Sequence, residues 1–382
     1  MLNIEKLIIT SKNFLNYRFI FLTDSIGSVS CRMKCIIPSR SLNLYGIESH
    51  VVVKDDIDDY LKLSRENDVV IISKVHPWLC NSTLETIAKI KSNVSYVFCE
   101  ASEEGSFHSF YSNDVACESP LSILSGLIDG FIYETRNLKD LIQQKVKGAN
   151  TFLARHVHSN CHNFFNSASP IGSNEKIEIY KKDIHENLSQ ACKQIFKNKN
   201  FARTGYIGRP KYCHDYLALN VCNYELSHRL GRCLEFISCN PGPHDNVQKT
   251  LLIDFGYSLM KKELSISKNY FDYKTGNKVT ALWSLGIPGL FSPLASYKKI
   301  FSDNDIDFEF WSIPEYKRHD CPISNSRSLG TAMCEKIEKI ITDKDYEQRR
   351  IELFNISSRY NPVNIFWLYE DIFNYILKQE RE

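Results

Sequence analysis

The sequence predicts an α/β protein of two αβα lobes, each built on a parallel sheet, with a cleft between them. Short apolar runs alternate with helical stretches of about 10–15 residues, which is the pattern of βαβ units. The alternation stops over residues 159–200, which are polar and lack a clear strand, and then begins again. The chain has 382 residues, enough for two domains of ordinary size.

The first lobe is expected to be a Rossmann-like domain over residues 1–165. Residues 1–10 are strand-like, and the charges inside this run are unlike a secretory signal. Helical periodicity is clearest over residues 56–66 and 82–91. Strands are expected at residues 20–23, 49–53, 68–73, 95–99, 130–133 and 150–153.

The second Rossmann-like lobe is expected over residues 166–360, with the join near residues 155–175. An amphipathic, aromatic-rich stretch follows Pro362, so residues 361–382 are expected to form a closing helix that packs back on the first lobe. Two doubly wound lobes would turn the carboxyl ends of their strands, where ligands bind, toward one cleft. Strands are expected at residues 204–207, 233–238, 250–254, 287–291 and 308–311.

Composition limits the classes of partner and site. The formal net charge is +2, which gives no electrostatic reason to expect nucleic acid. No uncharged apolar run approaches the ~18 residues of a membrane helix. A cytoplasmic protein is expected, with membrane contact limited to a peripheral one at the inner face. The 13 cysteines include no CxxC pair, and reduced thiols are expected.

The most informative segment runs from residue 273 to residue 297. A polar loop with Lys278 leads into a short helix, and Gly286 and Pro288 then shape the turn into a buried strand. The helix N-terminus offers free backbone N–H groups and Lys278 adds a charge, which suits the diphosphate of a sugar nucleotide. The alternative interpretation is a surface loop with a solvated lysine. Ser296 and Tyr297 follow the strand.

These residues carry a resemblance. The chain resembles GT-B glycosyltransferases of bacterial surface-polysaccharide synthesis, of the GT4-like or Kdo-transferase-like kind, in which a Lys precedes a Gly-x-Pro element by eight residues and a Ser-Tyr pair follows. The resemblance implies that this segment binds a nucleotide-sugar donor and that no metal cofactor is needed. The segment departs from the commoner retaining pattern because it contains no pair of glutamates seven residues apart. The resemblance therefore leaves the stereochemistry open.

Two more turns are candidates for anion binding. Gly208 and Arg209 follow the first expected strand of the second lobe, where they fit a donor phosphate site, although a plain βα turn has the same appearance. Arg32 lies after a Gly-bearing loop that looks like the first loop of the family. Its guanidinium could grip a phosphate or a carboxylate, or lie in solvent on a helix.

An acidic patch follows the expected strand at residues 95–99. Glu100, Glu103 and Glu104 could hold a base or position acceptor hydroxyls, or could simply decorate a helix N-terminus that favours acids. Glu103 is the preferred catalytic residue, because Glu100 is available to cap the following turn. Asp215 and Asp254 remain alternatives, particularly for a CMP-linked donor.

The sequence therefore predicts transfer of a sugar from a nucleotide-sugar donor to a glycan or lipid-linked acceptor in surface polysaccharide synthesis. A CMP-sugar transferase of the Kdo type is the alternative within this class. A non-catalytic sugar- or nucleotide-binding module and a sugar-nucleotide epimerase are the alternatives outside it. His156, His158 and His162 have metal-compatible spacing, but no carboxylate cluster accompanies them, so no metal site is expected.

Overall fold

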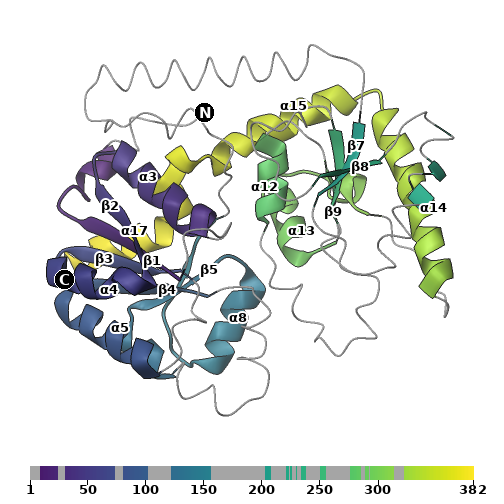
Figure 1. The fold of residues 1–382 in the computed structure, drawn as a ribbon. Helices are drawn as coiled ribbons and strands as arrows, with labels where there is room; N and C mark the ends of the chain where they lie inside the picture. Colours follow the sequence, from purple (N-terminus) through teal and green to yellow (C-terminus); the bar gives the residue numbers. More distant parts are fainter. Residues whose placement is uncertain are drawn as a thin grey trace. The chain divides into compact units, whose positions relative to one another are not determined.

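The computed structural model divides into two units, each described here by itself (Figure 1). Unit 1 comprises Met1–Tyr180 and Arg359–Glu382, and unit 2 comprises Lys181–Ser358. For Arg32, Lys278 and strands β7 to β9 the backbone alone is described. The described residues are 9–24, 31–73, 81–101, 122–155, 203–207, parts of a helix between 221 and 229, 234–237, 250–254, 276–284, 289–291, 293–313 and 322–382.

Unit 1 is built on a six-stranded parallel sheet with the order β2-β1-β3-β4-β5-β6. The chain moves from β1 outward to β2 and then returns to the other side of β1 for β3, so the direction of winding reverses between β1 and β3. Ligands of doubly wound sheets bind at the carboxyl ends of the strands beside such a reversal. The strands are β1 (Arg18–Thr23), β2 (Glu48–Val53), β3 (Asp68–Ile72), β4 (Tyr96–Glu100), β5 (Gly130–Tyr133) and β6 (Thr151–Leu153).

Burial explains why these runs become strands. Every residue of β1, β3 and β4 is buried, as expected for a parallel sheet that is covered on both faces. The predicted parallel α/β architecture is confirmed.

The expectation of strand-like structure over residues 1–10 is wrong for the part that the structure describes, because residues 9–12 form a helical turn. The amides of Asn13 and Phe14 donate to the carbonyl oxygens three positions earlier, which closes turns instead of a ladder. The helices are η1 (Arg32–Ile36, a π-helix), α3 (Ile37–Leu44), η2 (Lys54–Asp56), α4 (Ile57–Leu63), α5 (Asn81–Asn93) and α8 (Arg136–Lys145).

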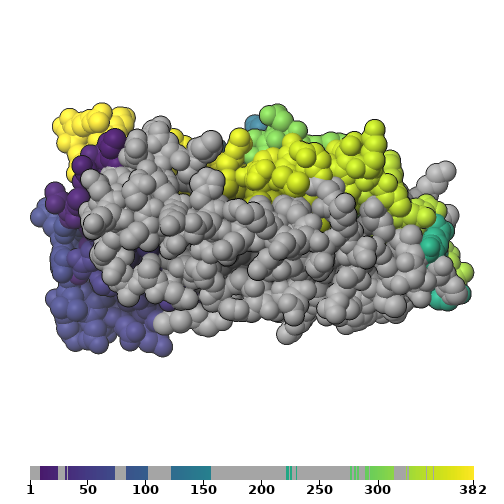
Figure 2. All heavy atoms as spheres, turned by 90° about the horizontal axis from the view of Figure 1, so that it is seen from above, coloured from purple at the N-terminus to yellow at the C-terminus, as the bar shows by residue number. Residues whose placement is uncertain are grey.

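The end of the chain completes the core of unit 1. It forms η5 (Ser358–Tyr360), η6 (Pro362–Asn364), α16 (Ile365–Leu368) and α17 (Glu370–Gln379), with Tyr369 between the last two helices. Phe373 packs its ring 4.8 Å from that of Phe14 and 5.7 Å from that of Phe19. In Figure 2 the yellow end of the chain accordingly lies against the purple N-terminal elements.

Unit 2 contains a four-stranded parallel sheet with the order β10-β9-β7-β8. No described helix of the protein is both long and apolar enough to cross a membrane. The elements of unit 2 are β7 (Arg203–Ile207), β8 (Leu234–Ile237), β9 (Thr250–Asp254), α12 (Asn277–Ser284), β10 (Gly289–Phe291), α13 (Ala295–Ser302), η4 (Glu309–Trp311), α14 (Pro322–Ile341) and α15 (Tyr346–Ser357).

The expectation of a strand at residues 308–311 is wrong. Glu309–Trp311 form a 3₁₀ turn, and only Ser312 makes an isolated bridge, to Phe291. The Asp307 carboxylate accepts a hydrogen bond from the Glu309 amide at 2.9 Å, which favours the turn. The Phe308 side chain is buried without a strand, because its ring packs edge-on against that of Phe301, with the ring centroids 5.1 Å apart.

Candidate functional site

Three adjacent strands of unit 1 bring polar side chains to one edge of the sheet. Ser73 follows β3, Glu100 is the last residue of β4, and Glu134 follows β5. The strands pair in parallel, with Glu100 opposite Ile132, so their carboxyl ends lie together. Ser73 also continues the ladder by donating its amide hydrogen bond to the Leu22 carbonyl at 2.8 Å. The three side chains therefore share the edge at which a doubly wound sheet binds ligands.

Lys34 joins the two carboxylates. Its ammonium nitrogen forms an ion pair with Glu100 Oε1, and it lies 3.0 Å from Glu134 Oε2. The side chains of Lys34, Glu100 and Glu134 are 10%, 7% and 8% exposed respectively. Ser73 Oγ donates to Glu100 Oε2 at 3.5 Å. One cation thus faces two carboxylates in a buried cluster, which carries a formal charge of −1 when all three groups are ionised.

The π-helix η1 places Lys34 in this cluster. Single π-turns recur at functional sites, because they re-aim side chains that an α-helix would point elsewhere. Cys31, Met33 and Cys35 are buried on the same segment and anchor it to the core. The hydrogen bond that the Cys35 thiol donates to Cys31, together with burial, raises the pKa of Cys35. Cys35 is therefore a neutral packing group and not a nucleophile.

The C-terminal segment contributes Tyr369 to the surroundings of the cluster. Burial and the nearby carboxylates of Glu100 and Glu134 raise the pKa of the Tyr369 phenol, whereas the charge of Lys34 lowers it. The hydroxyl therefore stays protonated at neutral pH and acts as a dipole beside the charges. Tyr369 also borders a small apolar cavity with Phe21 and Ile372, which has no polar lining to recognise a sugar or nucleotide.

The structure brings Glu100 into the cluster, but with a partner that the sequence did not indicate. Its side chain pairs with Lys34 and Ser73, although it was expected to be available as a turn cap. Glu103 and Glu104 lie outside the described residues, and Arg32 is placed on η1 by its backbone alone. Glu134 was overlooked, although the rule that led to Glu100 applies equally to the end of the expected strand at residues 130–133.

In unit 2 the order of the elements directs the N-termini of α12 and α13 toward the carboxyl edge of the sheet. α13 begins shortly after the end of β10 in the sequence, and α12 ends shortly before the start of β10. The first turn of α12 holds Asn277 and the backbone of Lys278, and the first turn of α13 holds Ser296 and Tyr297. Both helices therefore direct their positive dipole ends toward this edge.

The side chains of these turns differ in their surroundings. Tyr297 is buried and packs edge-on at 5.6 Å from the ring of Phe291, so it is part of the core. Ser296 is 5% exposed, and its hydroxyl has no hydrogen-bond partner in the described part of the chain. Asn277 Oδ1 is also buried and unpaired there. Asp254 ends β9 at the same edge. The other candidates of this unit lie outside the described residues: Gly208, Arg209, Asp215, Gly286 and Pro288.

Metal-binding chemistry has no visible site in the described ranges. No three His, Cys, Asp or Glu side chains lie together there as a ligand set. The described cysteines are free thiols, namely Cys31, Cys35, Cys99, Cys222 and Cys334.

Comparisons with known proteins return structural similarity alone. No protein-family model and no curated protein matches the sequence. Similarity to HepE of Anabaena, crystallised with UDP, covers 95% of this chain and 99% of HepE at 9% identity, with a TM-score of 0.49. A variant of TarM from S. aureus, crystallised with fondaparinux, alpha-GlcNAc-glycerol and UDP, is matched over 83% of this chain and 58% of TarM at 11% identity, with a TM-score of 0.38. The trehalose-6-phosphate synthase OtsA is matched over 83% of this chain and 74% of its own, at 11% identity and a TM-score of 0.37.

Proposed function

We propose that the protein is a glycosyltransferase that uses a nucleotide-sugar donor. The observation that carries the proposal is the order α12-β10-α13 in unit 2, which directs both helix N-termini toward the carboxyl edge of the sheet. Each helix end presents backbone N–H groups without intrahelical partners and the positive end of a dipole. Together they favour a ligand with two linked anionic groups, as in a nucleoside diphosphate sugar.

The side chains at this edge fit such a ligand. Asn277 Oδ1 can only accept a hydrogen bond, whereas the Ser296 hydroxyl can donate or accept. A buried polar atom without a partner costs about 1–3 kcal/mol, so native structures retain few of them. A sugar nucleotide offers hydroxyl donors as well as phosphate acceptors. In our proposal Lys278 and Arg209 neutralise the phosphates, with Gly208, Gly286 and Pro288 shaping the turns around them.

The acceptor is assigned to the carboxyl edge of the unit 1 sheet. Carboxylates there would orient an acceptor hydroxyl, and Glu103 would take its proton as the hydroxyl oxygen attacks the anomeric carbon. The bond from that carbon to the diphosphate oxygen then breaks, and the nucleotide leaves with the bonding electrons. Positive groups and helix N-termini stabilise the charge that develops on the leaving group. Binding both reactants in one orientation supplies the rest of the barrier reduction.

The narrower proposal is transfer to a glycan or lipid-linked acceptor in surface polysaccharide synthesis, without a metal cofactor. It rests on the resemblance of the segment from Lys278 to Tyr297, and the same segment keeps the CMP-sugar alternative open. Arg32 is included in the proposal as a contact for an anionic group of donor or acceptor.

A nucleotide panel tests the proposal. Thermal unfolding would be followed with UDP, GDP, CMP and ADP, and nucleotide release would then be measured with the sugar form of the best ligand. Saturation at 100 times the dissociation constant stabilises a protein by about 2.7 kcal/mol. Stabilisation by none of the four would contradict the proposal. Stabilisation without turnover would favour a binding module, and nucleotide release that needs no acceptor would favour an epimerase.

A further inference from the structure

We propose that Lys34 and Glu134 are positioning residues that together set the ionisation of the Glu100 carboxylate, which Lys34 favours and Glu134 opposes, and that orient it toward an acceptor hydroxyl. This inference rests on the proposed function, because it gives the unit 1 edge an acceptor to hold. The three residues come from different elements: the π-helix η1, the end of β4 and the residue after β5. Their meeting at one strand edge is the geometric basis of the proposal.

Within the triad of Lys34, Glu100 and Glu134, the Coulombic interactions have opposite effects on the ionisation of Glu100. Lys34 lies against both carboxylates and favours their ionised forms, whereas each carboxylate disfavours ionisation of the other. These interactions are strong because all three side chains are nearly excluded from water. The ionised fraction of Glu100 therefore depends on Lys34 in one direction and on Glu134 in the other.

Among the described residues, the thiols of Cys99 and Cys35 and the phenol of Tyr369 lie near Glu100 and stay protonated at neutral pH. Burial raises the pKa of the Cys99 thiol, and Cys31 and burial raise that of Cys35. The pKa of the Tyr369 phenol is raised by burial and by the carboxylates. Ser73 donates a hydrogen bond to Glu100 Oε2 and carries no charge. The acid limb of the pH profile, where activity falls as the pH is lowered, should therefore respond to both Lys34 and Glu134 in any activity that needs ionised Glu100.

The roles of the triad follow from hydrogen-bond chemistry. An ionised carboxylate can only accept hydrogen bonds, so it can accept the hydrogen bond of a sugar hydroxyl. A protonated carboxyl group also donates a hydrogen bond, so it no longer fixes the hydroxyl as the donor. Lys34 also fixes the orientation of Glu100 by pairing with Oε1 while Ser73 pairs with Oε2. Positioning an acceptor hydroxyl within hydrogen-bond distance is a requirement for its deprotonation by a neighbouring base.

Two substitutions of opposite sign test the inference. Nucleotide release would be followed against pH with UDP-glucose, GDP-mannose and CMP-Kdo as donors and a set of methyl glycosides as acceptors. Lys34→Met should move the acid limb up by about one to three pH units, which is the effect of one opposite charge at this distance. Glu134→Gln should move it down, because Lys34 then faces Glu100 alone. Lys34→Arg keeps the charge, so it should lower the rate while leaving the limb in place.

Matched controls separate a positioning role from a structural one. Lys91→Met removes a lysine that pairs with Asp129 at 2.7 Å beside the amino end of β4, and it should leave the limb unchanged. ¹³C NMR titration of the Glu100 carboxyl would report the same opposite shifts without any substrate. Acid limbs equal to that of the wild type in Lys34→Met and Glu134→Gln would overturn the inference. Failure of the wild type to release nucleotide from every donor would instead overturn the proposed function.

Discussion

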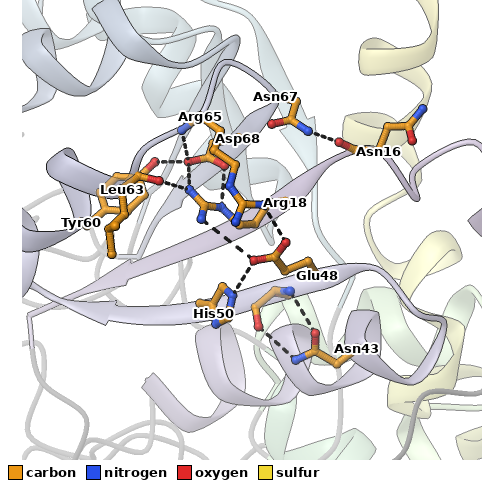
Figure 3. Close-up of polar contacts among 11 residues, drawn as sticks. Asn16, Arg18, Asn43, Glu48, His50, Tyr60, Leu63, Arg65, Asn67 and Asp68 are labelled. Atoms are coloured by element: carbon orange, nitrogen blue, oxygen red, sulfur yellow. Dashed lines mark hydrogen bonds and ion pairs between the residues drawn. The ribbon is translucent and has the colours of Figure 1, made fainter.

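Arg18 and Asp68 form a buried ion pair that joins the amino ends of β1 and β3 (Figure 3). Two parallel hydrogen bonds connect them, from Nε to Oδ1 at 2.7 Å and from Nη2 to Oδ2 at 2.6 Å. The hydroxyl of Tyr60 donates to Asp68 Oδ2 at 2.9 Å, and Arg18 Nη2 also donates to the Leu63 carbonyl at 2.8 Å. The pair therefore holds the sheet at the edge opposite the candidate site.

Breaking this pair should strongly destabilise unit 1. In Asp68→Asn the guanidinium of Arg18 loses its buried counter-charge and keeps only Glu48, whose half-exposed carboxylate lies 4.0 Å away. Removing one partner of a buried ion pair typically costs about 3–5 kcal/mol. The free energy of unfolding would be measured in urea with a signal from unit 1. Asp59→Asn is the matched control, because its pair with Lys62 is exposed and should contribute little. Equal effects of the two substitutions would show that Asp68 is not required in its charged form.

The sequence predicted the strands more reliably than the contacts between them. Residues 68–73 are an apolar run between polar segments, and such a run becomes a strand wherever a parallel sheet covers both of its faces. The run at residues 308–311, Phe-Glu-Phe-Trp, is also rich in side chains that favour strands, although these are aromatic instead of β-branched. It forms a turn because the Asp307 carboxylate accepts the hydrogen bond of the Glu309 amide and the ring of Phe301 packs against that of Phe308. Pattern alone does not distinguish these two outcomes.

The candidate site shows the same limit. Glu100 could be found because the carboxyl end of a parallel strand is a favoured location for functional groups. Lys34 could not be assigned in the same way, since its partner Glu134 lies 100 positions away and a π-helix directs its side chain. Neither the long-range pairing nor the local helix type has a signal in the sequence.

The hydroxyl of Tyr45 should make stability depend on pH in the alkaline range. Burial raises the pKa of Tyr45, which donates to the Val363 carbonyl at 2.7 Å. The unfolded chain releases this proton near pH 10 and the folded chain does not, so the free energy of unfolding falls as pH rises above 10. Tyr45→Phe should cost about 0.5–1.5 kcal/mol at pH 7. Its deficit should shrink toward zero near pH 11, and a deficit that stays constant between these pH values would contradict this assignment.

The donor assignment predicts a loss of nucleotide affinity in unit 2. Lys278→Ala and Arg209→Ala should each weaken binding by about 1.5–3 kcal/mol, the contribution of a charge-assisted hydrogen bond. Calorimetric titration with the nucleotide that gives the largest thermal shift would measure the change. Lys299→Ala serves as the control, because Lys299 is exposed on α13 and pairs with Asp303. Unchanged affinity in both test variants would remove these residues from the donor site.

Activity is expected without a divalent metal. No Asp-x-Asp sequence stands at the end of an expected strand, where a metal-bridged diphosphate would be held. Helix N-termini and basic side chains would neutralise the leaving group instead. Turnover should therefore be the same with EDTA as with added magnesium or manganese. Loss of activity in EDTA that either ion restores would refute the metal-free mechanism.

The acidic segment after β4 should separate catalysis from binding. β4 ends at Glu100, and the next acid along the chain, Glu103, follows that end closely enough to reach the same sheet edge. A base must lie within about 3 Å of the hydroxyl it deprotonates, or one water away. Glu103→Gln should therefore lower turnover by about 10²–10⁴ while nucleotide affinity stays unchanged. Glu100→Gln should also lower turnover, because the neutral amide of Gln cannot pair with Lys34 as a carboxylate does. Glu85→Gln, an exposed change on α5, provides the comparison. Near-normal turnover in both Glu100→Gln and Glu103→Gln would remove the segment from the mechanism and leave Asp215 and Asp254 as the acids to test.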